Sequence, residues 1–155
     1  MPRAQAEALC ADCGICCKGT LFVSVAVDAE AEARLRGRLP VVQATRGPVV
    51  PLPCAALDGV RCSVYPDRPD RCRTFICELR RDLEEGRVSL AHARAMIDET
   101  RALAATVTSR LPTGVAWWTA LPKLDRARAA LGPERLALLE AIEELARRVK
   151  TRFWQ

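Results

Sequence analysis

The second half of the chain has the apolar spacing of α-helices. Apolar residues recur there every three or four positions, which places them on one helix face. A helix is expected from Ser89, which can cap it, to a point before Pro112. After a connector with a proline near each end, a short helix from Asp125 to near Gly132 and another with Pro133 in its first turn are expected. The predicted buried positions of the two longer helices are Leu90, Ala93, Ile97, Thr100, Ala104, Val107, Leu138, Ile142, Leu145 and Val149.

The first half instead has short apolar runs separated by turn residues. Residues 1–20 are expected to form a cysteine-bearing loop that ends at the Gly19 turn, and "LFVSVAV" (residues 21–27) predicts a strand. Asp28 can cap a helix over the next nine residues, which Pro40 closes. Prolines at positions 48, 51 and 53 argue against a central, fully paired strand in the segment that follows.

Two further elements are predicted among the later cysteines. Asp58-Gly59, between two apolar runs, is typical of a two-residue hairpin that would bring Cys54 and Cys62 together. A helix then follows a pair of prolines. Its apolar positions are Phe75, Ile76, Leu79 and Leu83, and Gly86 is its expected end.

At 155 residues, the length favours a single domain, residues 1–155, that can bury a core without disulfides. The expected fold is an irregular α+β one. A cysteine-rich, metal-organised half, residues 10–77, would carry short strands, a hairpin and a short helix. It would pack against a helical half, residues 89–153.

The composition predicts a soluble protein of the cytoplasm. No apolar run is long enough to span a membrane, and the N-terminus has neither the apolar core nor the charge pattern of a secretion signal. Thiols are kept reduced in the cytoplasm, so eight cysteines favour metal binding over disulfides. The formal charge of +5 counts cysteine as neutral, and it falls to +1 if eight thiolates hold two divalent ions. With only seven aromatic residues, the sequence argues against nucleic-acid binding.

The cysteines are grouped in a way that predicts metal binding. Cys10, Cys13 and Cys16 recur at every third position, a spacing that also opens the iron–sulfur motif of bacterial ferredoxins. Structural zinc more often takes a CxxC pair from each of two loops, and no second CxxC exists here, so iron–sulfur is modestly favoured over zinc. The candidate ligands are Cys10, Cys13, Cys16, Cys17, Cys54, Cys62, Cys72 and Cys77.

The number of centres stays open at the level of sequence. Adjacent side chains such as those of Cys16 and Cys17 diverge, so the two thiols would serve neighbouring centres, or one would bind metal and the other support it. On one regular helix Cys72 and Cys77 would be about 140° apart. Either Cys72 precedes the helix, or the two serve different centres. Eight thiols can form two four-cysteine sites or one cluster with spare thiols.

Few other residues suggest chemistry. Of the arginines near the later cysteines, Arg68 and Arg73 could equally support thiolates or face solvent, whereas Arg80 and Arg81 are expected to be solvated. The single histidine, His92, is expected at the surface, and of the Trp117-Trp118 pair at least one is expected in the core. No hydrolase triad or nucleotide-binding loop is present, so no catalytic residue is assigned and an enzymatic activity stays undecided.

The segments "CADCGICC" (from Cys10), "PC" (53–54) and "CSVYPDRPDRCRTFIC" (62–77) resemble the YkgJ-type cysteine-cluster family, a zinc- or iron-chelating CxxCxxCC domain. The resemblance covers residues 10–77 and all eight cysteines. It implies a bacterial, cytoplasmic metal-chelating domain with these cysteines as ligands. Some longer relatives are associated with lysine N-methylation of flagellin, in which the domain resembles an iron–sulfur module that works with S-adenosylmethionine.

Three functions are therefore carried forward. The first is a metal-binding protein whose fold is organised by its metal. The second is an iron–sulfur module for redox chemistry or methyl transfer. The third is a metal carrier with at least one partly exposed, exchangeable site, for which the Cys16-Cys17 pair is the candidate. The metal ion or cluster is the expected partner, and no protein partner is identified.

Overall fold

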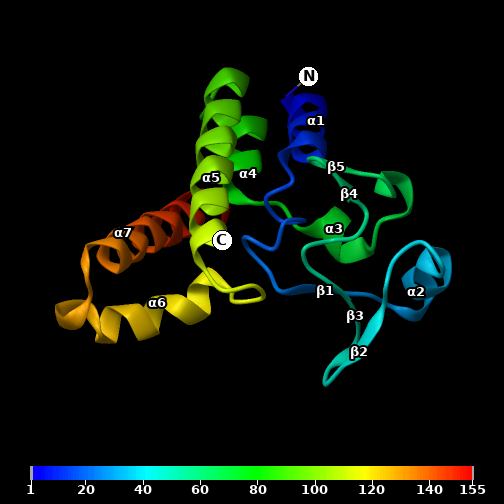
Figure 1. The fold of residues 1–155 in the computed structure, drawn as a ribbon. Coiled ribbons are helices and arrows are strands. Elements are labelled where there is room, and N and C mark those ends of the chain that lie inside the picture. The colour runs from blue at the N-terminus through cyan, green and yellow to red at the C-terminus, as the bar shows by residue number, and fades with distance from the viewer. Residues whose placement is uncertain (1, 155) are drawn as a thin grey trace. The chain divides into compact units, whose positions relative to one another are not determined.

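The computed structural model describes residues 2–154 and divides the chain into two compact units, one ending at Arg94 and one beginning at Ala95. The boundary falls inside α5 (Leu90–Arg110) (Figure 1). The first unit holds the cysteines and all the strands, and the second is helical. The expected mixed α+β class, with a cysteine-rich first half and a helical second half, is confirmed. A single domain stays a prediction, and each unit is described separately below.

The chain begins with a helix that the sequence analysis assigned to a loop. Helix α1 (Pro2–Cys13) is rich in alanine, the strongest helix former. It ends at Gly14, whose φ of +67° is the left-handed conformation that terminates helices. A Cβ at Gly14 would lie 3.2 Å from the backbone of Val60, so the end of α1 closely approaches the hairpin loop.

The small antiparallel sheet has the order β1-β3-β2, with β1 (Ser24–Ala26), β2 (Val42–Ala44) and β3 (Gly47–Pro51). The prediction was wrong in that β3 is central despite its prolines. It holds in that β3 is not fully paired. Residues 47–49 face β2, residues 49–51 face β1, and only Val49 has a partner on both sides. Pro48 and Pro51 therefore each adjoin one strand only, which limits the hydrogen bonds that they remove.

Helix α2 (Ala29–Leu35) follows β1, and Asp28 caps it as expected, accepting a 2.7 Å hydrogen bond from the Ala31 N–H. The helix ends before Gly37 rather than at Pro40. It contributes to a hydrophobic cluster against which two cysteines, Cys54 and Cys62, also pack. The buried members of the cluster are Val27, Ala31, Leu35, Leu39, Val50, Ala56 and Val64.

The predicted hairpin exists, with its loop shifted by one residue. Strands β4 (Leu57–Asp58) and β5 (Arg61–Cys62) pair Asp58 with Arg61, so Gly59 and Val60 form the two-residue loop. Gly59 has a φ of +60° at the first loop position, where type II′ turns require a positive φ. The hairpin places Cys62 opposite Leu57.

The single helix predicted around Phe75 is divided in two. A 3-10 turn, η1 (Tyr65–Asp67), precedes α3 (Asp70–Thr74), and α4 (Glu78–Glu84) starts after three non-helical residues. Phe75 has an extended backbone, and its ring meets that of Phe22 edge-to-face at 4.9 Å. The chain thus leaves the helical conformation at Phe75, the residue that makes this aromatic contact. Cys72 thus lies in α3, whereas Cys77 lies just before α4.

The second unit contains the rest of α5, α6 (Trp117–Arg126), a 3-10 turn η2 (Arg128–Ala130), α7 (Pro133–Arg148) and a π-helical end η3 (Val149–Phe153). Within it α6 packs against α7. The predicted buried face of α7 is confirmed at Leu138, Ile142, Leu145 and Val149.

Residues 117–123 are not a connector. They form most of α6, which continues through Pro122 at its sixth position although a proline there removes one backbone hydrogen bond of the helix. The helix predicted from Asp125 is accordingly wrong, since α6 already ends at Arg126. The rings of Trp117 and Trp118 touch edge-to-face at 5.3 Å, and both are half-buried, so the expected core tryptophan is not found. Among the described residues, no helix has the length and apolar character needed to cross a membrane.

Candidate metal centre

All eight candidate cysteines lie in the first unit as free thiols. Cys10 is exposed and the other seven are half-buried. Five separate segments supply them: the end of α1, the turn after it, the hairpin region, α3 and the start of α4. The fold therefore brings cysteines from distant parts of the sequence into one unit.

The first four cysteines lie in the last turns of α1 and in the turn that follows it. Cys10 and Cys13 are three residues apart in its last turns and lie on the same side of the helix. Cys16 and Cys17 lie in the following turn, which is closed by two backbone hydrogen bonds, from Lys18 N–H to Gly14 O at 2.9 Å and from Gly19 N–H to Cys16 O at 3.1 Å.

Cys77 joins this group because α1 packs against α4. Burial raises the pKa of the Cys16 thiol well above its ordinary value, and the neighbouring charges of Cys13, Cys77 and Cys10 raise it further. Cys17 adds the smallest contribution. Burial also raises the pKa of Cys77, and a hydrogen bond from the backbone N–H of Arg80 lowers it. Cys10, Cys13, Cys16 and Cys77 are thus neighbours.

The remaining cysteines gather around Cys17. Its backbone carbonyl accepts a 2.8 Å hydrogen bond from the Cys54 N–H. Burial raises the pKa of Cys17 to about 11, with the charges of Cys54 and Cys62 as the next causes and that of Cys10 as a lesser one. Burial likewise raises the pKa of Cys72 to about 12, and its charged neighbours are Cys17, Cys54 and Cys62.

Arg80 contradicts the expectation that it faces solvent. It is only 8% exposed, because α1 covers this side of α4. Its Nε donates to Glu84 Oε1 at 2.9 Å, and its Nη2 lies 3.8 Å from Glu7 Oε1. Burial alone would lower the pKa of Arg80, but hydrogen bonds to Glu84 and to the Cys10 thiol raise it. Arg81, with 42% of its side chain exposed, is solvated as predicted.

Arg68 and Arg73, which the sequence analysis expected either to support thiolates or to face solvent, have different environments in the structure. The guanidinium carbon of Arg68 lies 3.6 Å from the centroid of the Tyr65 ring, and its charge lowers the pKa of both Cys17 and Cys72. The buried Nε of Arg68 has no hydrogen-bond partner. Arg73 instead donates to the backbone carbonyls of Arg68 and Pro66 and so stabilises the turn.

The donor set matches zinc or iron, because both metals bind thiolates. The thiols are neighbours without forming a closed cage. Among residues 2–154, no three Cys, His, Asp or Glu side chains are placed so that one ion could touch all of them. Each cysteine has one side-chain torsion with three staggered positions. Metal binding therefore requires rotation of side chains that the fold has already brought close together.

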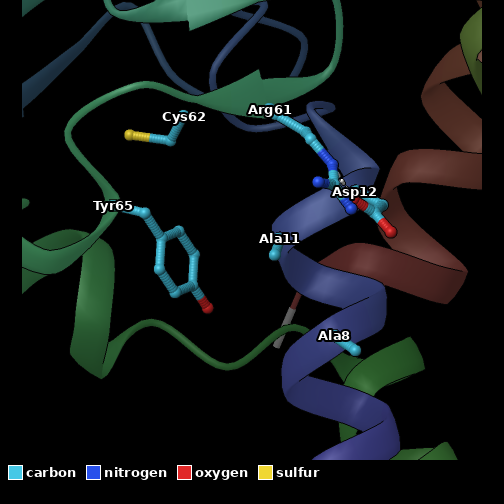
Figure 2. A pocket seen from close by; sticks show the side chains of 6 residues that line it. All are labelled: Ala8, Ala11, Asp12, Arg61, Cys62 and Tyr65. Atoms are coloured by element: carbon cyan, nitrogen blue, oxygen red, sulfur yellow. Dashed lines mark hydrogen bonds and ion pairs between the residues drawn. The ribbon is translucent and has the colours of Figure 1, made fainter.

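His92 is exposed, as expected, and its backbone N–H donates to the hydroxyl of the cap residue Ser89 at 3.2 Å. A pocket of about 340 Å³, which the sequence analysis did not anticipate, lies beside the second group of cysteines (Figure 2). The Arg61–Asp12 ion pair, with 2.6 Å between Nε and Oδ1, lies at one side of it. Its lining residues are Ala8, Ala11, Asp12, Arg61, Cys62 and Tyr65.

Comparison with known proteins supports the metal-binding interpretation. The model of the family described as "CxxCxxCC: Putative zinc- or iron-chelating domain" matches residues 9–93. Searches of curated proteins and of solved structures give no significant match. The matched segment includes all eight cysteines and covers more than half of the chain. The chain therefore belongs to the CxxCxxCC family.

Proposed function

We propose that the protein binds zinc or iron through Cys10, Cys13, Cys16, Cys17, Cys54, Cys62, Cys72 and Cys77, and that the metal organises the first unit. The observation that carries this proposal is the gathering of eight free thiols from five separate segments of one unit. A set of thiolates at this density is stable as a metal complex in a compartment that keeps thiols reduced, so we place the protein in the cytoplasm.

The energies involved support a structural role for the metal. Zinc held by four thiolates contributes on the order of 10–16 kcal/mol in small domains. A whole domain is stable by only about 5–15 kcal/mol. The strands of the first unit are two to five residues long, and its helices after α1 have five to seven residues. Elements this short depend on tertiary links, which a metal would supply.

For the choice between zinc and iron, the cysteine spacing leads us to favour iron–sulfur modestly, because Cys10, Cys13 and Cys16 recur at every third position. The thiolates would hold the cluster, and the cluster would supply electron-transfer chemistry. Arg80 and Arg68 would offset the negative charge of the thiolates that they adjoin. A role in redox chemistry or methyl transfer would build on such a cluster.

A metal carrier is the second candidate, and the exposed position that favours it is Cys10 rather than the half-buried Cys16-Cys17 pair named in the sequence analysis. An exposed ligand can be attacked by the thiol of an acceptor, which allows metal to leave by ligand exchange. This function predicts a difference in the rate of zinc transfer to a competing thiol ligand. Transfer should be faster from the wild-type protein than from a variant in which Cys10, the exposed cysteine, is shielded from solvent.

The proposal is tested on the full chain purified without oxygen. We expect stoichiometric zinc or iron by elemental analysis. Visible sulfur-to-iron absorption together with acid-labile sulfide would identify a cluster. A variant with all eight cysteines replaced by serine should contain neither metal. His92→Ala is the matched control, because it removes the only histidine, an exposed residue, and should keep the metal content unchanged. Equal metal content in wild type and the cysteine-free variant would refute the proposal.

A further inference from the structure

We propose that the eight cysteines form two separate four-cysteine centres whose members are interleaved along the sequence. Cys10, Cys13, Cys16 and Cys77 form the first centre, and Cys17, Cys54, Cys62 and Cys72 form the second. The inference rests on the proposed metal binding and specifies its architecture. It differs from a division in chain order, in which the first four cysteines and the last four would each bind one ion.

The first centre is built by the contact between α1 and α4. Cys10 and Cys13 lie at the end of α1, and Cys77 immediately precedes α4, so helix packing brings the last cysteine of the sequence to the first two. Arg80 reinforces this contact, since it lies in α4 and hydrogen-bonds the Cys10 thiol. Cys16 completes the set, with Cys13 and Cys77 as its strongest charged neighbours.

The second centre is built around the hairpin. The backbone hydrogen bond from Cys54 to Cys17 joins the turn after α1 to the start of the hairpin region. Cys54 and Cys62 pack against the same hydrophobic cluster. Cys72 enters from α3, with Cys17, Cys54 and Cys62 as its charged neighbours. None of its strongest neighbours belongs to the first set.

Two local features explain why cysteines that follow each other along the sequence belong to different centres. Cys16 and Cys17 are consecutive, so their side chains diverge, and the strongest neighbours of each lie in a different set. Cys72 and Cys77 are separated by the helix break at Phe75. Charge interactions between the sets exist as well, but Cys17 influences Cys16 less than Cys13, Cys77 and Cys10 do, and Cys10 influences Cys17 less than Cys54 and Cys62 do. The centres are therefore neighbours joined through the Cys16-Cys17 peptide bond.

Each centre also has its own arginine. Arg80 serves the first through Cys10, and Arg68 serves the second through Cys17 and Cys72. A divalent ion with four thiolates carries two negative charges, which a nearby guanidinium partly offsets. One cation beside each set fits two separate centres.

The test is a Co²⁺ titration of the full, metal-free chain without oxygen, because tetrahedral thiolate coordination gives Co²⁺ strong visible bands. Wild type should take up about two ions per chain, one for each set of four thiolates. Two double variants that share Cys77→Ser then distinguish the divisions. Cys16→Ser/Cys77→Ser should keep about one ion, because both changes fall in one centre, whereas Cys72→Ser/Cys77→Ser should keep none in tetrahedral thiolate coordination.

Division in chain order predicts the reverse result for the two variants, which would overturn the interleaved assignment while leaving the proposed metal binding intact. Loss of both ions from each single Cys→Ser variant would indicate one shared cluster and would also overturn it. A wild-type chain that takes up no Co²⁺, Zn²⁺ or iron would overturn both proposals together.

A second measurement on the wild type does not depend on the variants folding. The chain is loaded with about one equivalent of Zn²⁺, alkylated, and analysed by intact mass and by peptide mapping. Half-loaded molecules should carry about four alkyl groups, and the protected cysteines should belong to one of the two proposed sets. Protection that mixes members of the two sets in the same molecules would overturn the assignment.

Discussion

The guanidinium of Arg68 lies over the ring of Tyr65, with 3.6 Å between Cζ and the ring centroid. This cation–π contact holds the charge of Arg68 beside Cys17 and Cys72. Tyr65 also lines the pocket in Figure 2. The Tyr65 ring therefore both lines the pocket and holds the guanidinium whose charge acts on two candidate ligands.

Replacing the ring should test this contact. Tyr65→Leu removes the aromatic face and is expected to lower the free energy of unfolding of the metal-loaded chain by about 0.5–2 kcal/mol. Tyr65→Phe keeps the face and should stay close to wild type. Denaturant unfolding of the three proteins measures the effect, and equal losses in both variants would show that the hydroxyl, rather than the stacking, matters.

Arg80 and Arg81 are consecutive, and the structure assigns them opposite environments. Arg80→Met should lower the free energy of unfolding by about 1–3 kcal/mol, because it removes charged hydrogen bonds to Glu84 and Cys10 from a buried position. Arg81→Met should change it by less than about 0.5 kcal/mol, since that side chain is partly exposed. Similar effects of the two substitutions in denaturant unfolding would contradict the burial of Arg80.

Gly14 should tolerate no side chain. Gly14→Ala forces a left-handed residue, at a cost of about 1–2 kcal/mol, and adds a Cβ close to the backbone of Val60. Gly37→Ala is the matched control, because Gly37 also has a positive φ but has open space where the Cβ would be. Thermal unfolding should therefore show a larger loss at position 14, and equal losses would mean that α1 does not approach Val60.

Glu144 should make the second unit sensitive to acid. Hydrogen bonds from Arg147 and Arg148 lower the pKa of Glu144 to about 2. A carboxylate whose pKa is lower in the folded chain stabilises it above the unfolded pKa and loses that contribution as the pH falls through the folded one. Glu144→Gln should thus lower the melting temperature at pH 7, and the difference from wild type should shrink towards pH 2. A constant difference across this range would exclude the charge as its cause.

Metal removal should affect the two units differently, because all eight cysteines lie between residues 10 and 77. Treatment with a chelator should increase amide hydrogen exchange throughout the first unit, whereas peptides from α6 and α7 should keep their protection. Exchange that rises equally in both units would show that they unfold together, and unchanged exchange would show that the metal has no structural role.

Sequence reasoning succeeded where a local signal decided the structure. The caps at Asp28 and Ser89 and the apolar face of α7 follow from neighbouring residues alone. It missed α1 because cysteines at every third position are compatible with a loop as well as with a helix, so their spacing alone does not distinguish the two. It also placed α6 too late, since Pro122 was interpreted as a boundary, whereas the helix continues through this proline despite the backbone hydrogen bond that it removes.

The candidate ligands could be identified from sequence, but their grouping could not. Spacing along the chain suggested four early and four late cysteines. Which thiols become neighbours depends on the packing of α1 against α4 and on the contact between Phe22 and Phe75, and both are long-range. Arg80 was misjudged for the same reason, because only the position of α1 decides that its side chain is covered.

The three non-helical residues between α3 and α4 have a consequence for sequence variation. Their number sets the direction of Cys72 relative to Cys77. Adding or deleting one residue in an adjoining helix turns the side chains beyond it by about 100°. Functional relatives should therefore keep the length of this interval constant.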